Sequence, residues 1–318
     1  MGGNIFKGKT QPIKKEHILI TVEKYFADLG RVFPHKKDMY NTQKMKFIGS
    51  VMKKDLSGDI DFAIDISSIA DKKFSDKSLA KWGLNGEEVK AQMLKYKKRA
   101  KTATDAELMT RAVMKGIVDK INALSDNIYC DEKKIGSGGI FGFFPQYNEA
   151  GEALDYGVQM DWMIGNLEWL EFSYYSETYE GNVKGLHRTQ LMLSMFNHYG
   201  LSFNHTKGVS NLETKEVLAT NPKEAVEILE EFTKTKLSKN TIKNYHKLMA
   251  VINKLPKKDA KGIIGIYLKI LDRTRCDIPT DLQDTWTKRK SELGLTGKFL
   301  PEGSMLQESV KFADFIGA

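Results

Sequence analysis

Two aspartates separated by one residue, Asp59 and Asp61, are the side chains of this sequence best suited to hold a metal ion. They lie in a segment, 59–66, that alternates polar or small residues with large apolar ones, which predicts a half-buried strand. Residues two apart on a strand point to the same face, so both carboxylates project together. Carboxylates held side by side repel each other unless a cation lies between them. Magnesium prefers oxygen ligands and keeps substrate phosphates in its coordination shell, so the pair predicts a magnesium site.

A Gly-Ser pair upstream supports this interpretation, because a bare Asp-x-Asp also occurs on strands whose outer face is merely solvated. Gly49-Ser50 follows a short predicted strand and is separated from Asp59 by eight residues. A glycine has no β-carbon, so backbone amides can approach a phosphate closely at that point. The Ser50 hydroxyl and the N–H groups around it can hold a terminal phosphate. Lys53 or Lys54 would assist, although a surface charge explains either lysine equally well.

A third carboxylate, Asp161, interrupts an otherwise apolar predicted strand over 158–164. An unpaired carboxylate in such a strand is costly to bury, so it needs a partner or a metal ion. The alternatives are an aspartate that faces solvent on an edge strand, or one paired with a lysine. We expect Asp161 to join Asp59 and Asp61, and we place Asp155 in a loop. Asp65 lies further along the first strand and is expected to be structural or solvated.

With these residues the sequence resembles the nucleotidyltransferase superfamily that contains DNA polymerase β, poly(A) polymerases and tRNA CCA-adding enzymes. The pattern of that family is a hydrophobic residue, Gly, then Gly or Ser, a short spacer, and Asp-hydrophobic-Asp or Glu. Ile48-Gly49-Ser50 and Asp59-Ile60-Asp61 match it, and the layout is most similar to that of CCA-adding enzymes and poly(A) polymerases. The resemblance covers about residues 45–66 and 155–166.

The resemblance implies metal-assisted phosphoryl transfer. Asp59, Asp61 and Asp161 would be both the catalytic residues and the ligands of two Mg²⁺ ions, which Mn²⁺ can replace. Gly49, Ser50 and Lys53 would bind a nucleoside triphosphate, with ATP or CTP favoured. A hydroxyl at the 3′ end of a nucleic acid, RNA or tRNA above all, would attack the α-phosphate and release pyrophosphate. The alternatives are transfer to a small molecule or a protein, as in antibiotic-modifying and toxin-type relatives, and a non-catalytic nucleic-acid-binding protein.

Other features of the sequence allow two interpretations each. Arg188 stands near the start of a predicted helix, where fixed amides and a guanidinium favour a nucleotide phosphate, but a surface salt bridge is equally ordinary. The adjacent His187 is expected to pack or lie at the surface. The glycine-rich segment 136–144 does not fit a P-loop; it is either a mobile element near base or primer or a hairpin turn over an aromatic cluster. The run 95–101, five cations in seven residues, suits a nucleic acid strand or a solvated helix face.

The elements around these residues predict an α/β (α+β) head with a small mixed sheet, followed by a mostly α-helical C-terminal region. We expect a catalytic domain over 1–210, with its palm-like core at about 45–166, and a basic helical domain over 211–318. Apolar spacings of three and four predict a helix over 13–29, and 75–124 is also predicted to be helical. Asn221-Pro222 is a helix start. The helical region carries 18 Lys and Arg against 13 Asp and Glu from Pro222 onward, and a further helix is expected over 305–316.

Composition narrows the class of protein. The chain has 318 residues, 41% hydrophobic, with a formal net charge of +8, and a basic excess favours a polyanionic partner. No apolar run approaches the roughly 20 residues of a spanning helix, and the first residues resemble neither a signal peptide nor a myristoylation site. Cys130 and Cys276 lack zinc or disulfide spacing. The sequence therefore predicts a cytoplasmic protein without a membrane partner, and it leaves the oligomeric state open.

Overall fold

The computed structural model of the chain describes residues 5–6, 8–100, 103–135, 138–176, 185–274, 278–279, 282–292 and 294. The chain divides into two compact units. The sheet unit consists of residues 2–47 and 55–167, and the helical unit consists of residues 48–54 together with residues from 168 onward. The compositional boundary predicted at 210/211 falls inside the helical unit, within one strand of its small sheet.

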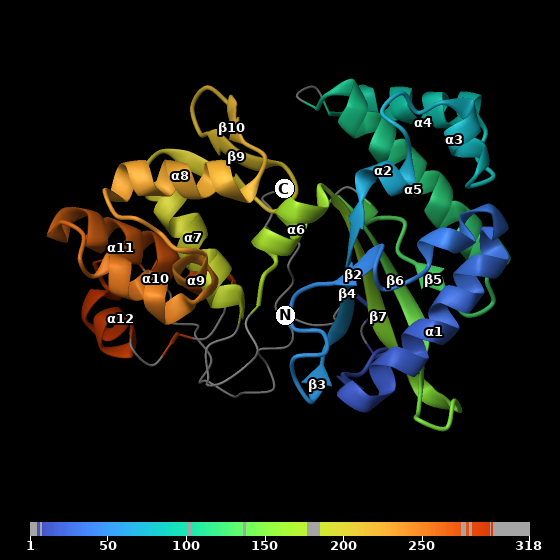
Figure 1. The fold of residues 1–318 in the computed structure, drawn as a ribbon, viewed down its shortest axis with the longest axis horizontal. Helices are drawn as coiled ribbons and strands as arrows, with labels where there is room; N and C mark the ends of the chain where they lie inside the picture. Colours follow the sequence, from blue (N-terminus) through green and yellow to red (C-terminus); the bar gives the residue numbers. More distant parts are fainter. Residues whose placement is uncertain are drawn as a thin grey trace. The chain divides into compact units, whose positions relative to one another are not determined.

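The sheet unit is built on a five-stranded mixed sheet with the order β2-β4-β7-β6-β5 (Figure 1). The strands are β2 (Met45–Phe47), β4 (Asp59–Asp65), β5 (Tyr129–Cys130), β6 (Gly139–Tyr147) and β7 (Ala153–Gly165). Only the central pair, β4 and β7, is parallel; every other pair is antiparallel. A short antiparallel pair, β1 (Ile13–Lys14) with β3 (Leu56–Ser57), lies outside this sheet.

Helices of the sheet unit fall into two groups. Helix α1 (Lys15–Val32) precedes β2 and confirms the helix predicted over 13–29; a 3-10 helix, η1 (Pro34–Met39), follows it. The others lie in one insertion between β4 and β5: α2 (Ile66–Ile69), α3 (Asp76–Ala80), α4 (Gly86–Lys97) and α5 (Asp105–Leu124). Asp65 caps α2 by accepting a hydrogen bond from the Ser67 amide, so the expectation of a structural role for this aspartate holds.

The core of the sheet unit lies where helices α1 and α5 pack on the sheet. Ile60, Phe62 and Ile64 are fully buried on β4, as the alternation of the strand predicts. The Tyr25 ring of α1 stacks on Phe62, and its hydroxyl accepts a hydrogen bond of 2.8 Å from the Trp162 indole of β7. The apolar residues of β4 and β7 are therefore anchored on one face, which leaves the alternate residues to the other face.

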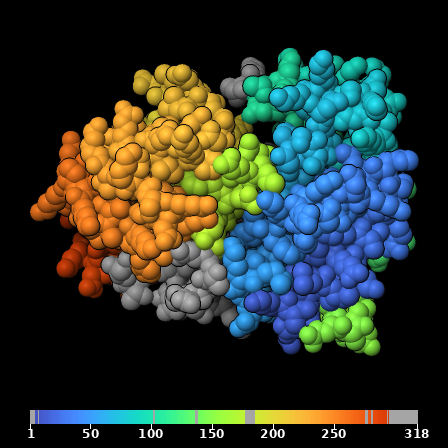
Figure 2. Space-filling model, viewed as in Figure 1, coloured from blue at the N-terminus to red at the C-terminus, as the bar shows by residue number. Residues whose placement is uncertain are grey.

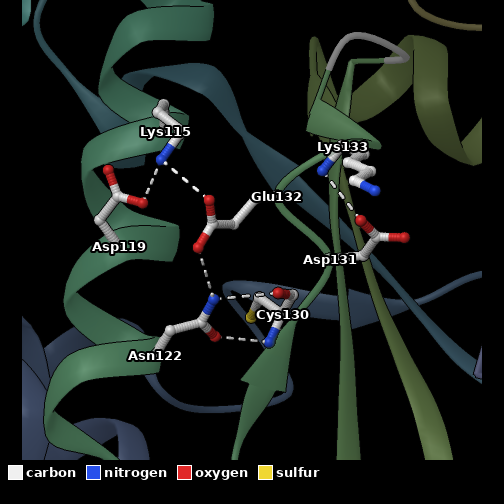
Figure 3. A network of polar contacts seen from close by, with 7 residues as sticks. All are labelled: Lys115, Asp119, Asn122, Cys130, Asp131, Glu132 and Lys133. Carbon is white, nitrogen blue, oxygen red and sulfur yellow. Dashed lines mark hydrogen bonds and ion pairs between the residues drawn. The ribbon is translucent and has the colours of Figure 1, made fainter.

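A polar network ties the edge strand β5 to helix α5 (Figure 3). The Asn122 side chain donates to the Cys130 carbonyl at 3.0 Å and accepts from the Cys130 amide at 2.7 Å. Lys115 on the same helix pairs with Asp119 and Glu132. Burial, together with the negative charge of Asp161, raises the pKa of the Cys130 thiol, so this cysteine is a packing residue and not a nucleophile.

The helical unit contains α6 (Leu167–Ser173), which enters it from β7, and α7 (Gly185–His198). A three-stranded antiparallel sheet follows, in the order β10-β9-β8. Its strands are β8 (Leu201–Asn204), β9 (Gly208–Asn211) and β10 (Val217–Ala219). The remaining helices are α8 (Pro222–Thr233), α9 (Lys239–Lys243), α10 (Tyr245–Ile252), α11 (Lys257–Thr274) and α12 (Gln283–Arg289). Asn221 caps α8, with Pro222 at its first position, as predicted.

One continuous core holds the helical unit together. Trp169, Phe196 and Phe203 form an aromatic group in which the last two rings are stacked with centroids 5.5 Å apart. Fully buried residues of α10 and α11, such as Leu248 and Leu268, extend this group. The core thus joins the small sheet to the helices.

The predicted fold class is confirmed: a mixed sheet with helices precedes a mostly helical region. The predicted helix over 305–316 and Cys276 lie outside the described residues. Within the described part of the chain, no helix has both the length and the apolar character needed to span a bilayer.

Residues 136 and 137 of the glycine-rich segment 136–144 lie outside the described residues, and the rest corrects our expectation of a turn or a mobile element. From Gly139 onward it belongs to β6, paired on both sides, with β5 and with β7. A β-carbon at Gly139 would lie 2.5 Å from the Trp162 carbonyl oxygen. Glycine at this position therefore allows a close approach of two strands and not a turn. Asp155, expected in a loop, lies exposed in β7.

Candidate functional site

The structure brings the three predicted carboxylates together on the sheet unit. Strands β4 and β7 pair so that Asp61 lies opposite Asp161 and Asp59 lies opposite Gln159. Paired residues on neighbouring strands share a face of the sheet, and that face is opposite to the one covered by Tyr25. One carboxylate oxygen from each of Asp59, Asp61 and Asp161 lies within 4.8 Å of the other two. Three side chains from two distant segments thus form one acidic group.

Little solvent reaches these carboxylates. Asp161 is 3% exposed and Asp59 is 9% exposed, while Asp61 is intermediate. On the neighbouring strand β6, Phe141 pairs with Asp161 and adds a buried apolar ring to the same face. Two unit charges 4.8 Å apart repel each other by roughly 3 kcal/mol at an effective dielectric constant of about 20. Without a cation the group is therefore unfavourable when fully ionised.

The pKa directions express this repulsion. Burial, followed by the charge of Asp59, raises the pKa of Asp61 well above its usual value. Burial, followed by the charges of Asp61 and Asp59, does the same to the pKa of Asp161. The metal-free group therefore retains protons at pH values where an ordinary aspartate has lost them. A divalent cation would displace those protons.

Gln159 is a part of the site that sequence reasoning missed. Its side-chain amide donates a hydrogen bond of 2.7 Å to Oδ2 of Asp161, and its own oxygen accepts from the Ile5 amide at 3.1 Å. The other Asp161 oxygen, Oδ1, is buried and has no hydrogen-bond partner among the described residues. The spacing Gln159-x-Asp161 repeats the period-two pattern of Asp59-x-Asp61, and this signal would have identified the glutamine.

The donor set fits a hard divalent cation. All three groups offer carboxylate oxygens, and neither histidine nor cysteine takes part in this group. Such donors suit Mg²⁺ or Mn²⁺ and do not resemble a structural zinc site. The buried Oδ1 of Asp161 supports the same conclusion, because a buried oxygen without a partner is costly unless something binds it.

The Gly49-Ser50 turn belongs to the helical unit and follows β2 directly along the chain. Gly49 has a left-handed backbone (φ 64°), which glycine adopts at no steric cost. Its amide donates to the Tyr174 carbonyl at 3.2 Å, so this amide holds the turn in place. The Ser50 carbonyl accepts from the Lys53 amide at 3.1 Å and closes the turn. The binding of phosphate by this turn stays a prediction.

Three cations of the helical unit surround one aromatic ring, that of Tyr175. The amino group of Lys53 lies 5.3 Å from the ring centroid, that of Lys243 lies 4.3 Å away, and the Arg188 guanidinium lies 5.9 Å away. Burial and the nearby Lys243 lower the pKa of Lys53. Burial, Lys239 and Arg188 lower the pKa of Lys243. Glu171 partly offsets the repulsion at Lys243, but cations outnumber it around the ring, which makes this cation cluster a favourable place for an anion.

Within the cation cluster, Arg188 and Lys53 also have structural contacts. Arg188 is 2% exposed and donates to the carbonyls of Ile242, at 2.8 Å, and Phe172, at 2.7 Å. Lys53 donates to the carbonyls of Gly49 and Ser176. Arg188 therefore organises the unit from within, and its predicted contact with a nucleotide stays a prediction. His187, adjacent to it, is buried against the Tyr267 hydroxyl, as the expectation of packing requires.

Lys243 and Tyr175 were not identified from the sequence. They lie far from Lys53 along the chain, and no local spacing connects the three. The only local signal was Lys239 and Lys243 at a separation of four residues, which places like charges on neighbouring turns of a short helix. Tertiary packing alone brings these groups to one ring.

Comparison with known proteins leaves these geometric findings as the basis for any functional assignment. No family model matches the sequence, and a search of curated proteins gives no significant relative.

Proposed function

We propose that this protein is a metal-dependent nucleotidyltransferase. It would transfer a nucleoside monophosphate from a nucleoside triphosphate to the 3′ end of a nucleic acid, with RNA favoured, and release pyrophosphate. The observation that carries the proposal is the register of β4 and β7, which places oxygens of Asp59, Asp61 and Asp161 within 4.8 Å of one another. The Asp-x-Asp spacing after Gly49-Ser50 supports the same class of reaction.

Each carboxylate has a role in this proposal. Asp59 and Asp61 would hold the divalent cations from adjacent positions on one strand, and Asp161 would complete their ligand set from the next. When bound, Mg²⁺ supplies charge stabilisation for the phosphate oxygens and lowers the pKa of an attacking hydroxyl. The hydroxyl oxygen forms a bond to the α-phosphorus while the bond from that phosphorus to the bridging oxygen breaks, and pyrophosphate leaves with the bond's electrons. The hydroxyl proton would pass to a carboxylate of this group, Asp161 above all.

The cation cluster of the helical unit, taken by itself, is a place that favours a polyphosphate. Burial and a neighbouring cation lower the pKa of the Lys53 amino group and that of the Lys243 amino group. A bound anion relieves that repulsion. The cluster therefore supports a triphosphate-dependent reaction more directly than net charge alone.

Lys243→Ala is expected to weaken the binding of inorganic tripolyphosphate by about tenfold. A hydrogen bond to a charged group contributes roughly 1.5 kcal/mol, and about 1.4 kcal/mol corresponds to a factor of ten in affinity. Isothermal titration calorimetry without metal measures this directly. Lys247→Ala, an exposed lysine on the next helix, is the matched control and should bind as the wild type does. Equal affinity of the Lys243→Ala variant and the control would show that the cation cluster is not the anion site.

The transferase reaction itself is tested with purified protein, Mg²⁺ and each α-labelled nucleoside triphosphate in turn, with and without total RNA. We expect label to enter RNA and pyrophosphate to appear in equal amount, and chelation of the metal should abolish both. Label that enters a small product or the protein while RNA stays unlabelled would refute the proposed acceptor. Failure to use any triphosphate with either Mg²⁺ or Mn²⁺ would refute the transferase assignment.

A further inference from the structure

The insertion between β4 and β5, residues 66–124, has an excess of positive charge. It contains 13 Lys and Arg against 7 Asp and Glu, a net charge of +6, which exceeds the +5 of the longer region from Pro222 onward. Its helices α3 and α4 lie together beyond the end of β4, where α2 leaves the sheet (Figure 1). One part of the sheet unit therefore carries a marked positive charge.

Most of these cations are exposed and unpaired. Exposed cations of the insertion are Lys72, Lys73, Lys77, Lys81, Lys90, Lys95, Lys97, Lys98 and Arg99. Lys90 pairs with Glu87 and Lys97 pairs with Asp105. Among the described residues the other seven have no ion pair, and Figure 2 shows the residues of α3 and α4 open at the surface. Exposed acidic residues also lie among them, namely Asp71, Asp76, Glu87, Glu88 and Asp105, but they are fewer than the nine exposed cations. The surface therefore keeps an excess of positive charge.

The end of helix α4 has the densest group of positive charges. Lys95 and Lys97 lie in its last turn, and Lys98 and Arg99 follow directly past its end, so four cations fall within five residues. The helix dipole favours cations in a last turn, but it does not account for Lys72, Lys73, Lys77 and Lys81, which precede the helix. Stability therefore does not explain the arrangement, and an anionic partner does.

The surroundings of these cations favour a nucleic acid over a membrane. Helix α4 exposes only one large apolar side chain among its described residues, Leu94, and buries only Val89 fully. A helix that binds a lipid surface presents a broad apolar face. Next to the lysines, the Arg111 guanidinium lies 4.4 Å from the Tyr96 ring centroid, which adds a further cation beside an aromatic ring. Cations interleaved with an aromatic residue are typical of surfaces that follow a phosphate backbone.

We propose that the insertion binds the phosphate backbone of a nucleic acid strand, with Lys95, Lys98 and Arg99 as its main contacts. This inference deepens the proposed function and rests on it for the identification of the strand as the acceptor. The contacts are to phosphates, so they position the strand without reading its sequence.

The test is the binding of a short fluorescent single-stranded RNA to the full chain, measured by anisotropy in chelator and without nucleotide. The triple variant Lys95→Ala, Lys98→Ala, Arg99→Ala should bind the RNA on the order of 100-fold more weakly at about 0.1 M salt. The slope of log K against log salt concentration should also become shallower by about 2, because each phosphate contact to a single strand contributes about 0.7 to that slope. Lys254→Ala, Lys257→Ala, Lys258→Ala removes the same charge from exposed lysines of the helical unit. That control should change affinity less than about threefold, because these lysines are not among the proposed contacts.

Three outcomes would overturn the inference: no binding of RNA by the wild type, equal losses in the two triple variants, or binding of anionic phosphatidylserine vesicles through these cations in place of RNA. If circular dichroism shows that the triple variant is misfolded, Lys98→Glu, at an exposed residue just past the helix end, gives the second readout.

The failure of this inference can be distinguished from the failure of the proposed function, because the binding test contains neither metal nor triphosphate. RNA binding without nucleotide transfer would refute the proposed function alone. Transfer that survives the triple variant at unchanged RNA affinity would refute this inference alone.

Discussion

Asp61→Asn is expected to reduce nucleotide incorporation by at least about 1,000-fold while leaving the thermal midpoint of the metal-free protein as high or higher. Metal ions supply several kcal/mol of charge stabilisation in the transition state, and about 4 kcal/mol corresponds to a factor of 1,000 in rate. The midpoint does not fall because the exchange removes one charge from a buried group whose members repel each other, as the raised pKa of Asp61 indicates. Incorporation of labelled nucleotide and thermal unfolding, measured on the same preparation, give both quantities.

The matched control is Asp65→Asn, an exchange of the same kind on the same strand. Asp65 caps α2 through the Ser67 amide, and asparagine caps a helix about as well as aspartate does. Its turnover and its thermal midpoint should therefore stay close to those of the wild type. Full activity in the Asp61→Asn variant would show that this carboxylate takes no part in the reaction. An equal loss of activity in the Asp65→Asn control would show that activity depends on the total charge of the strand and not on Asp61 itself.

The second large effect concerns pH and metal together. The folded protein holds the protons of Asp61 and Asp161 more tightly than the unfolded chain does, because both pKa values are raised. The free energy of unfolding of the metal-free protein should therefore fall as pH rises. This fall begins at about pH 4, the ordinary pKa of aspartate, and ends at the raised pKa values of the folded protein. Each fully responding group contributes about 1.4 kcal/mol per pH unit. Chemical denaturation at a series of pH values, wild type against Asp161→Asn, isolates this contribution.

Saturating Mn²⁺ should oppose this pH dependence. A ligand at 100 times its dissociation constant stabilises the folded state by about 2.7 kcal/mol, and the gain grows with pH because protons compete for the same oxygens. An identical pH dependence in the wild type and the Asp161→Asn variant, both without metal, would contradict the electrostatic coupling of the three carboxylates.

The local part of the site could be predicted from the sequence. The period of two over 59–65 is sufficient to place Asp59 and Asp61 on one face and Ile60, Phe62 and Ile64 in the core, and the structure confirms both. The pairing of Asp61 with Asp161 could not be predicted to the residue. It depends on the register of two strands separated by the whole insertion, and a slip of one residue would have turned Asp161 to the other face.

The expectations that the structure corrects and the residues that sequence reasoning missed share a tertiary cause. Glycines at 139 and 142 were interpreted as signs of a turn, but they lie in a strand that is paired on both sides. Arg188 was identified near a helix start, where a surface position is ordinary, yet packing turns it inward onto the carbonyls of Ile242 and Phe172. Lys243 reaches Tyr175 only through the packing of α9 in the helical unit. In each case the deciding contact joins segments that are distant in the chain.

The most direct test of the account is a titration of the purified protein with Mn²⁺, with the free ion followed by electron paramagnetic resonance. We expect the wild type to bind Mn²⁺, with Mg²⁺ competing, and the affinity to fall as pH is lowered. Asp61→Asn and Asp161→Asn should each weaken binding severely, while Asp65→Asn should bind as the wild type does. Mn²⁺ binding that is absent from the wild type, or that survives unchanged in both variants, would contradict the claim that these carboxylates form a metal centre.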